Sequence, residues 1–316
     1  MNRDPVIVAA VRTPIGRQGG ALSSMEASEF GAIVIKEAMN RAKVSADMID
    51  DVIFGNVLSG GGNIARLTAL STGLSLDIPG LTVDRQCGSG INAVNLAAQA
   101  IKAGDGDVYI AGGTESMSLA PYLMEKPKKP FSPAPPRFKS AVLSPKEIGN
   151  PPMGITAENL VSKYEISRAE QDEYALRSQQ RMAAAVSEGR FDEQIVPVEI
   201  RQRKGDPFLF KADEHPRPNT TLEGLKALDP AFKEGGTVTA GSSSGLNDAA
   251  SAVVIMSREK ALELGLTPLC TVKQYAVAGV DPNIMGIGPV PAVKKVLEIA
   301  NLSLADMDIV ELNEAF

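Results

Sequence analysis

One stretch organises this chain of 316 residues: Val83-Asp84-Arg85-Gln86-Cys87-Gly88-Ser89-Gly90-Ile91-Asn92-Ala93-Val94. A turn signal and a short strand-like segment, residues 79–83, precede it. A helical pattern follows, with apolar residues at i, i+3, i+7 and i+10 counted from Ile91. Cys87 is therefore predicted to lie where a strand passes into a helix. Gly88 and Gly90 allow a sharp turn there and leave room for a ligand.

The thiol of Cys87 has two interpretations at this position. At a helix N-terminus it would face unpaired N–H groups and the positive end of the helix dipole. Both favour the thiolate, which is the nucleophilic form of cysteine. A lone cysteine can also be a small, buried hydrophobic residue. The residues by themselves leave both interpretations open.

Composition limits the classes of protein that the chain can belong to. It is 44% hydrophobic and 22% charged, and it is long enough for a large core or two to three domains. A net charge of −6 argues against a nucleic-acid partner, which would favour a basic surface. Two cysteines, Cys87 and Cys270, make no disulfide framework and favour a reducing compartment. No signal-peptide pattern and no apolar run of membrane-spanning length are found, so we expect a cytoplasmic protein with no membrane span.

Strands and helices alternate along the first 118 residues. Apolar runs predict strands at residues 5–11, 50–57 and 107–111, and helical periodicity predicts helices at 27–42 and 65–74. The glycines and polar residues at 112–116 predict a tight turn. Together with the helix after Cys87, this alternation predicts an α/β fold, with a mixed sheet covered by helices.

The pattern changes between about residue 118 and residue 245. Five prolines between residues 126 and 136 exclude regular structure there, and residues 156–186 are strongly helical, with a start that resembles a helix cap at 156–159. We interpret this part as an insertion or a lid that holds a substrate, because loops over a scaffold commonly do so. The alternation then returns, with strands predicted at 252–256 and 271–280 and helices at 258–264 and 290–300.

A helix–strand unit occurs twice in the chain. Residues 46–56 and 305–313 both follow a helix of similar length and, allowing one deletion, both end at an asparagine, Asn56 or Asn313. Self-similarity at this distance predicts a duplicated domain, with chance similarity as the alternative. The first copy continues through the Cys87 helix, whereas three residues follow Asn313. We therefore expect a second half truncated at its C-terminus, with a naturally short chain as the alternative.

Seven motifs of the sequence resemble those of the thiolase family, the acetyl-CoA acyltransferases and 3-ketoacyl-CoA thiolases. The resemblance covers the whole chain and includes the motif around Cys87. The motifs are Val11-Arg12-Thr13-Pro14-Ile15-Gly16, Arg85-Gln86-Cys87-Gly88-Ser89-Gly90, Gly112-Gly113-Thr114-Glu115-Ser116-Met117-Ser118, Met153-Gly154-Ile155-Thr156-Ala157-Glu158-Asn159, residues 241–248, Gly286-Ile287-Gly288-Pro289-Val290-Pro291-Ala292 and Asn313-Glu314-Ala315-Phe316.

The resemblance implies a duplicated αβαβα architecture of five layers, with a loop domain inserted into the first half. On this chain it predicts an N-terminal half formed by residues 1–118 and 246–267. Residues 119–245 would be the inserted, CoA-binding loop domain. Residues 268–316 would be the start of a C-terminal half that is incomplete.

The resemblance also implies acyl transfer between CoA thioesters, by thiolytic cleavage of 3-ketoacyl-CoA or by condensation of two acetyl-CoA molecules. Cys87 would be the nucleophile that becomes an acyl-thioester, with its own N–H in one oxyanion hole. Asn313 would fix the water that completes a second oxyanion hole, although a terminal amide can also be merely structural. Pro152, before Met153, favours the degradative members, but the sequence leaves the direction of reaction open.

Further residues are implied to bind CoA, which would be a substrate. Arg217 would lie near the nucleotide, Ser244 would hydrogen-bond the pantetheine arm, and Met153 would line the acyl end of the pocket. Apolar contacts would come from Leu228, Phe232, Ala240, Ala315 and Phe316. Without the resemblance, Arg217 would be a solvated loop residue, and Leu228 and Phe232 would be ordinary core residues.

The resemblance implies no metal and no permanently bound cofactor, a role in fatty acid metabolism, and a homodimer or homotetramer. Lys126, Lys128 and Lys129 could face CoA phosphates or belong to a solvated loop.

Two groups on which the family relies are not matched within residues 1–316. One is a histidine in a Gly-His-Pro motif that activates the nucleophile, and the other is a second cysteine in a Cys-x-Gly-Gly-Gly loop. His215 cannot replace the histidine, because it belongs to a loop motif that the resemblance implies to bind CoA. Cys270 cannot replace the second cysteine, because it belongs to a predicted strand without the glycines. A non-catalytic CoA-binding fragment or pseudo-enzyme is therefore an alternative. An α/β hydrolase is disfavoured, because Arg85 stands where its nucleophile elbow requires glycine.

Overall fold

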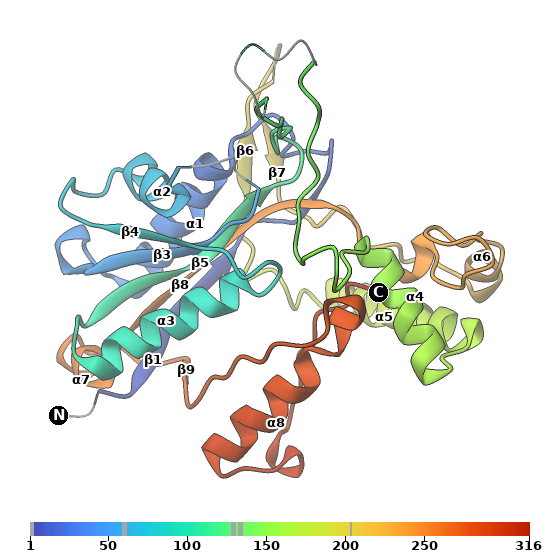
Figure 1. The fold of residues 1–316 in the computed structure, drawn as a ribbon. Coiled ribbons are helices and arrows are strands. Elements are labelled where there is room, and N and C mark those ends of the chain that lie inside the picture. Colours follow the sequence, from blue (N-terminus) through green and yellow to red (C-terminus); the bar gives the residue numbers. More distant parts are fainter. Residues whose placement is uncertain (1–2, 59–61, 128–130, 132–134, 203) are drawn as a thin grey trace. The chain divides into compact units, whose positions relative to one another are not determined.

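The computed structural model describes residues 3–58, 62–127, 131, 135–202 and 204–316 (Figure 1). The chain divides into two compact units. The first contains Met1–Phe138, Phe191–His215 and Leu246–Lys273, and the second contains Lys139–Arg190, Pro216–Gly245 and Gln274–Phe316. The division into three segments at residues 118, 245 and 267 stays a prediction.

A mixed β-sheet forms the centre of the first unit. Within the described residues its strand order is β4-β3-β5-β8-β1-β9, and β2 pairs with β8. The parallel strands β3, β4 and β5 continue into the antiparallel strands β8 and β1. The strands are β1 (Pro5–Arg12), β2 (Gly16–Arg17), β3 (Asp51–Gly55), β4 (Gly80–Val83), β5 (Val108–Ser116), β8 (Asn247–Ser257) and β9 (Cys270–Thr271). The α/β class predicted from the sequence is confirmed.

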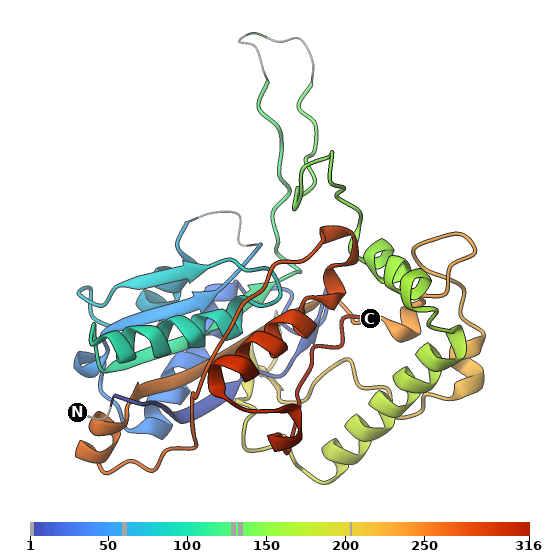
Figure 2. The same cartoon turned by 60° about the horizontal axis from the view of Figure 1, so that its bottom comes forward.

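Helices cover both faces of this sheet, as Figures 1 and 2 show. The helices α1 (Ala27–Ala42) and α2 (Ile64–Thr72) pack on one face, where Phe30, Phe54 and Val254 belong to one apolar core. The helix α3 (Ser89–Ala103) covers the other face. Because successive side chains of a strand point to opposite faces, a strand covered on both sides needs apolar residues at every position. This explains the continuous apolar runs in the sequence.

Smaller elements complete the first unit. The strands β6 (Val198–Ile200) and β7 (Phe208–Phe210) pair with each other, and Val198, Ile200, Phe210 and Leu22 form a second small core. The turn η1 (Ala46–Met48) precedes β3, and α7 (Arg258–Glu263) follows β8.

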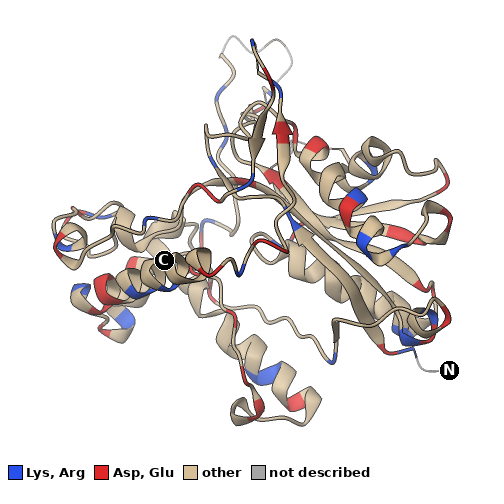
Figure 3. Cartoon of the chain, turned by 180° about the vertical axis from the view of Figure 1, so that it is seen from behind, with Lys and Arg blue, Asp and Glu red and all other residues tan. Residues whose placement is uncertain are grey.

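The second unit consists of helices, short 3₁₀ turns and loops. Its helices are α4 (Met153–Tyr164), α5 (Arg168–Ser187), α6 (Leu222–Lys226) and α8 (Pro289–Ala300), and its turns are η2 (Ala240–Ser242), η3 (Pro282–Ile287) and η4 (Leu304–Asp306). Charged residues of both signs are distributed along its helices and loops (Figure 3). Ser167 and Glu170 form a reciprocal capping box that starts α5.

One turn prediction and one strand prediction are wrong. The turn predicted at residues 112–116 is the end of β5, which pairs there with β8. A Cβ atom on Gly112 would lie 2.1 Å from the carbonyl oxygen of Ser251. The glycine is therefore needed to let β5 and β8 approach closely, and not to form a turn. The strand predicted at 271–280 is limited to Cys270 and Thr271, because β9 pairs with β1 at only Val6 and Ile7.

The helical segment predicted at 156–186 is two helices. Glu165 adopts a left-handed conformation with φ of 55° and ends α4. The helix cap expected at 156–159 is also wrong, because α4 begins at Met153 with Pro152 as its N-cap residue. The two copies of the repeat share a short 3₁₀ turn, η1 and η4, but the second copy has no strand assigned among the described residues.

No helix within the described parts of the chain combines the length and the apolar character needed to cross a membrane.

Candidate active site

Cys87 lies in the turn between β4 and α3, as the sequence predicts. The strand β4 ends at Val83, and α3 begins at Ser89 with Gly88 as its N-cap residue. The side chain of Cys87 is exposed, so the interpretation as a buried hydrophobic residue is wrong. The positive end of a 15-residue helix therefore begins two residues after the thiol.

Short hydrogen bonds fix this turn. The Ser89 hydroxyl accepts a hydrogen bond from the Arg85 N–H (2.8 Å) and donates to the carbonyl of Gln86 (2.5 Å). The N–H of Gly88 donates to the Arg85 carbonyl (3.1 Å). Gln86 itself has a φ of 49°, which costs a non-glycine residue about 1–2 kcal/mol. Strained backbone beside a reactive group is common at functional sites, because the surroundings must hold it there.

The strand β3 supports the start of α3 directly. A Cβ atom on Gly55 would lie 2.6 Å from the carbonyl carbon of Ser89 and 2.7 Å from the nitrogen of Gly90. Only glycine allows the helix backbone to approach the strand this closely. Packing and hydrogen bonds therefore both determine where Cys87 lies.

Glu115 is a candidate site residue that the sequence reasoning did not single out, although it lies in one of the seven motifs. It follows the paired part of β3 and β5, at the carboxyl ends of parallel strands where ligands commonly bind. Its carboxylate accepts hydrogen bonds from Asn56 Nδ2 (2.9 Å), the Val57 N–H (2.8 Å) and the Leu58 N–H (3.1 Å). Burial raises the pKa of Glu115, and these hydrogen bonds only partly oppose that rise.

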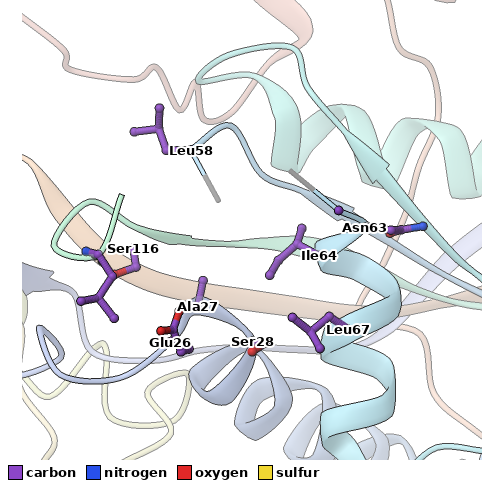
Figure 4. Close-up of a pocket in the computed structure, with 10 residues that line it drawn as sticks. Glu26, Ala27, Ser28, Leu58, Asn63, Ile64, Leu67 and Ser116 are labelled. Carbon is purple, nitrogen blue, oxygen red and sulfur yellow. Dashed lines mark hydrogen bonds between the residues drawn. The ribbon is translucent and has the colours of Figure 1, made fainter. Parts of the chain in front are cut away.

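A cavity of about 220 Å³ lies elsewhere in the first unit, between the starts of α1 and α2 and the end of β5 (Figure 4). Its lining residues are Glu26, Ala27, Ser28, Leu58, Gly62, Asn63, Ile64, Leu67, Ser116 and Leu119. None of the predicted site residues lines it.

Predicted CoA contacts come together in the second unit. The rings of Phe232 and Phe316 meet edge to face, with centroids 5.7 Å apart. The Phe232 ring also covers Gly154, where a Cβ atom would lie 2.1 Å from its Cγ, next to Met153 at the start of α4. Phe232 and Phe316 are each 40% exposed, so the interpretation of Phe232 as an ordinary core residue is wrong.

A second group of predicted contacts surrounds η2. Thr239 Oγ1 accepts hydrogen bonds from the N–H groups of Gly241 (3.2 Å) and Ser242 (3.3 Å), which fixes Ala240. Leu228, 37% exposed, covers this turn, since a Cβ atom on Gly241 would lie 2.7 Å from its Cδ1. The Ser244 N–H donates to the carbonyl of Ala315 at 2.9 Å. The second unit thus contains all eight residues predicted to contact CoA, including Ser244, which is predicted to bind the pantetheine arm.

Arg217 lies exposed in a loop of the second unit. Its N–H donates to Gln179 Oε1 of α5 (2.8 Å), and its carbonyl accepts from the N–H of Thr220 (3.1 Å) and from its hydroxyl (2.8 Å). Within the described residues no carboxylate forms an ion pair with its guanidinium. The backbone is therefore held while the charge stays available for an anion.

The segment that leads to Arg217 is fixed in the first unit. Arg12, from the first of the seven motifs, forms a bidentate ion pair with Asp213, with N–O distances of 2.7 and 3.0 Å. Glu214 accepts hydrogen bonds from the N–H groups of Arg17 (2.8 Å) and Ala21 (3.2 Å). The sequence reasoning did not predict these anchors, because 201 residues separate Arg12 from Asp213.

Asn313 is exposed in the second unit, directly before Glu314. Lys126 is exposed, and Lys128 and Lys129 lie outside the described residues. Within the described parts of the chain, no group of three or more His, Cys, Asp or Glu residues is arranged to hold a metal ion.

Comparison with known proteins identifies the family. The model of the thiolase N-terminal domain matches residues 5–259, and that of the thiolase C-terminal domain matches residues 266–316. The chain therefore belongs to the thiolase family, and it is an enzyme of the acyltransferase class.

Individual relatives agree with this assignment. The chain is 49% identical to the acetyl-CoA acetyltransferase of Cupriavidus necator, over 99% of this chain and 81% of that protein. It is 47% identical to the 3-oxoadipyl-CoA/3-oxo-5,6-dehydrosuberyl-CoA thiolase of Escherichia coli K12, over the same shares of the two chains. The crystal structure of the Bacillus anthracis acetyl-CoA acetyltransferase matches with a TM-score of 0.93 and 44% identity, over 99% of this chain and 80% of that one. The alternative of a pseudo-enzyme finds no support in these relatives.

Proposed function

We propose that this protein transfers acyl groups between CoA thioesters, with Cys87 as the acyl carrier. The observation that carries the proposal is the exposed thiol in a strained turn, two residues before α3 begins, in a chain of the thiolase family. A cysteine thiolate is a strong nucleophile toward thioesters, and a fixed turn holds it for attack.

The first step exchanges one thioester for another. The sulfur of Cys87 attacks the carbonyl carbon of acyl-CoA, and the carbon–sulfur bond to CoA breaks. The proton of the Cys87 thiol ends on the released CoA thiol, so atoms and charges balance. The N–H of Cys87 would stabilise the oxyanion of the tetrahedral intermediate.

The second step involves the other CoA thioester. In the condensing direction, the carbon next to its carbonyl attacks the acyl group on Cys87 and forms 3-ketoacyl-CoA. The bond between this acyl group and the sulfur of Cys87 breaks, and the proton lost from the attacking carbon ends on the Cys87 thiol. In the cleaving direction, the sulfur of Cys87 attacks the 3-keto carbon, the carbon–carbon bond breaks, and the proton of the Cys87 thiol ends on the released acetyl-CoA. The thiol of another CoA then takes the acyl group from Cys87, and its proton returns to the Cys87 thiol. Asn313, through a water that it fixes, would stabilise the charge on the carbonyl of this second thioester.

CoA would be held chiefly by the second unit. Arg217 would pair with the nucleotide, Ser244 would hydrogen-bond the pantetheine arm, and Met153 would line the acyl end. The apolar contacts would be Leu228, Phe232, Ala240, Ala315 and Phe316. Support comes from the partial exposure of Leu228, Phe232 and Phe316. Further support comes from Arg217, whose guanidinium forms no ion pair with any residue that the structure describes.

We further propose a cytoplasmic homodimer or homotetramer that acts in fatty acid metabolism. The support is membership of the thiolase family and the two free cysteines. Light scattering of the purified protein would measure the oligomeric state.

Mass spectrometry with acetyl-CoA tests the acyl carrier. The protein should gain one acetyl group, located on the peptide that contains Cys87, and the variant Cys87→Ser should not form this thioester. The matched control Cys270→Ser removes the other exposed cysteine and should be acetylated like the unaltered protein. An unaltered protein that stays free of acetyl groups would contradict the proposal.

A further inference from the structure

The segment that follows Asn313 is held by contacts with α5. The Ser178 hydroxyl donates a hydrogen bond to Glu314 Oε2 at 2.6 Å. The hydroxyl of Tyr174 also hydrogen-bonds Glu314, and this bond is the main cause of a raised pKa of Tyr174. Residues 174 and 178 are four apart in a helix, so both hydroxyls face the same carboxylate. Hydrogen bonds in which the acceptor is a carboxylate are stronger than hydrogen bonds between two neutral groups.

Two more contacts hold the residues after Glu314. The carbonyl of Ala315 accepts a hydrogen bond from the Ser244 N–H at 2.9 Å. The ring of Phe316 packs edge to face on Phe232. Three successive residues are therefore each fixed by a different part of the second unit, and Asn313 is the next residue along the chain.

We propose that Tyr174 and Ser178 are positioning residues that act through Glu314 to hold Asn313 in place for the second step of acyl transfer. This inference rests on the proposed function, because the role of Asn313 belongs to it. Neither hydroxyl touches the reacting atoms. Their effect arises because groups that stabilise an oxyanion must be held to within about 0.5 Å of their productive position.

The two steps should respond differently to loss of these hydroxyls. Acylation of Cys87 by acetyl-CoA would use the N–H of Cys87 itself and not Asn313. Formation or cleavage of the carbon–carbon bond would depend on Asn313. Loss of one oxyanion-stabilising donor costs about 10²–10³ in kcat, and a displaced donor should cost part of that.

The experiment measures both steps in the variants Tyr174→Phe and Ser178→Ala and in the double variant. Rapid quenching and mass spectrometry give the rate of Cys87 acetylation by acetyl-CoA, and steady-state assays give kcat for cleavage of acetoacetyl-CoA. In the double variant we expect kcat for cleavage to fall about 10-fold while the acetylation rate stays within 2-fold. Ser178→Thr, which keeps a hydroxyl, should restore cleavage.

Two comparisons separate positioning from a merely structural role. In an Asn313→Ala background the double variant should cause no further loss of kcat for cleavage, because the effects of substituting residues that act as one unit do not add. The controls Tyr164→Phe and Ser187→Ala remove hydroxyls from α4 and α5 that, among the described residues, form no hydrogen bond with Glu314, and they should leave both rates unchanged.

Three results would overturn the inference: unchanged cleavage in the double variant, equal loss of both steps, or a further loss in the Asn313→Ala background. An unaltered protein that neither acetylates Cys87 nor cleaves acetoacetyl-CoA would instead disprove the proposed function, and this inference with it.

Discussion

Each of the two compact units holds its predicted site residues by different physical means. In the first unit the turn of Cys87 rests on a sheet whose apolar core includes the fully buried Phe30 and Phe54. In the second unit, buried polar groups hold the loops. Glu158, only 3% exposed, accepts the N–H groups of Thr237 and Val238 at 2.8 Å each, and Asp172, fully buried, pairs with Arg168 at 2.8 Å.

This difference matches the different tasks that we propose for the two units. A nucleophile must keep its place to a fraction of an ångström, and a close-packed sheet gives that rigidity. A long, flexible substrate needs several separate contacts, and loops fixed at individual points provide them. We therefore expect changes around Cys87 in the first unit to alter kcat, and changes at the predicted CoA contacts of the second unit to alter KM for CoA.

The largest expected effect is that of Cys87→Ala. Loss of a nucleophile should lower kcat for acetoacetyl-CoA cleavage by about 10⁴-fold or more. Because the side chain is exposed, the melting temperature should stay unchanged. Cys270→Ala is the control and should keep normal turnover. Appreciable cleavage of acetoacetyl-CoA by Cys87→Ala would show that Cys87, and with it the first unit, does not supply the nucleophile.

The next effect belongs to the second unit. Arg217→Ala should raise KM for CoA about 10- to 100-fold with little change in kcat, because hydrogen bonds to charged groups contribute about 1.5–3 kcal/mol. The control Lys294→Ala removes an exposed charge from α8 and should leave KM unchanged. A fall in kcat at constant KM would contradict the division of tasks.

Gly55→Ala tests how rigidly the first unit holds the turn. The added Cβ would collide with the backbone of Ser89 and Gly90, so we expect the free energy of unfolding to fall by about 1–3 kcal/mol, together with a lower kcat. Urea unfolding and cleavage assays measure the two effects. Gly279→Ala is the control, because, apart from Gly279 itself and its two chain neighbours, no described residue has an atom within 4 Å of the added Cβ. Normal kcat in Gly55→Ala would mean that the turn tolerates displacement.

Glu158 tests the polar anchoring of the second unit. Glu158→Ala leaves two N–H groups without an acceptor and should cost about 1–3 kcal/mol of unfolding free energy and raise KM for CoA. Glu158→Gln should cost less, because both hydrogen bonds go to the one oxygen that an amide retains. Equal losses in the two variants would show that charge, and not hydrogen bonding, holds this loop.

The smallest expected effect is a pH dependence at Glu115. Its pKa is raised by burial, so the folded protein binds this proton more tightly than the unfolded chain does. The resulting stabilisation is present below the unfolded pKa of about 4.3 and is lost as the pH rises through the raised value. The unfolding free energy of the unaltered protein relative to Glu115→Gln should therefore decrease from pH 4 to pH 7.

Glu170 provides a control of opposite sign. Hydrogen bonds from Ser167 lower its pKa, so its stabilisation should be present above the unfolded pKa and be lost as the pH falls. The same difference measured with Glu170→Gln should therefore increase with pH. If the two differences in unfolding free energy changed with pH in the same direction, the causes assigned to the two pKa shifts would be contradicted.

Local patterns in the sequence predict most elements of the fold. The helix at 27–42 has the predicted bounds, and the turn of Cys87 follows from a strand, two glycines and a helical pattern. The sequence predicts a turn at Gly112, because glycine is common in turns. In the structure a glycine is required there because the backbone of Ser251, in a strand distant in sequence, lies too close for a side chain. Residues whose roles depend on distant partners, such as Glu115 with Asn56 or Ser178 with Glu314, give no local signal. The predicted CoA contacts came from family resemblance and not from periodicity.

Transfer from an isolated acetyl-protein tests the central claim most directly. The protein is acetylated with acetyl-CoA, separated from free nucleotide and then mixed with fresh CoA. We predict that the acetyl group leaves Cys87 and appears as acetyl-CoA in equal amount. An acetyl group that stays on the protein, or that is lost only as acetate, would contradict the role of Cys87 as the acyl carrier.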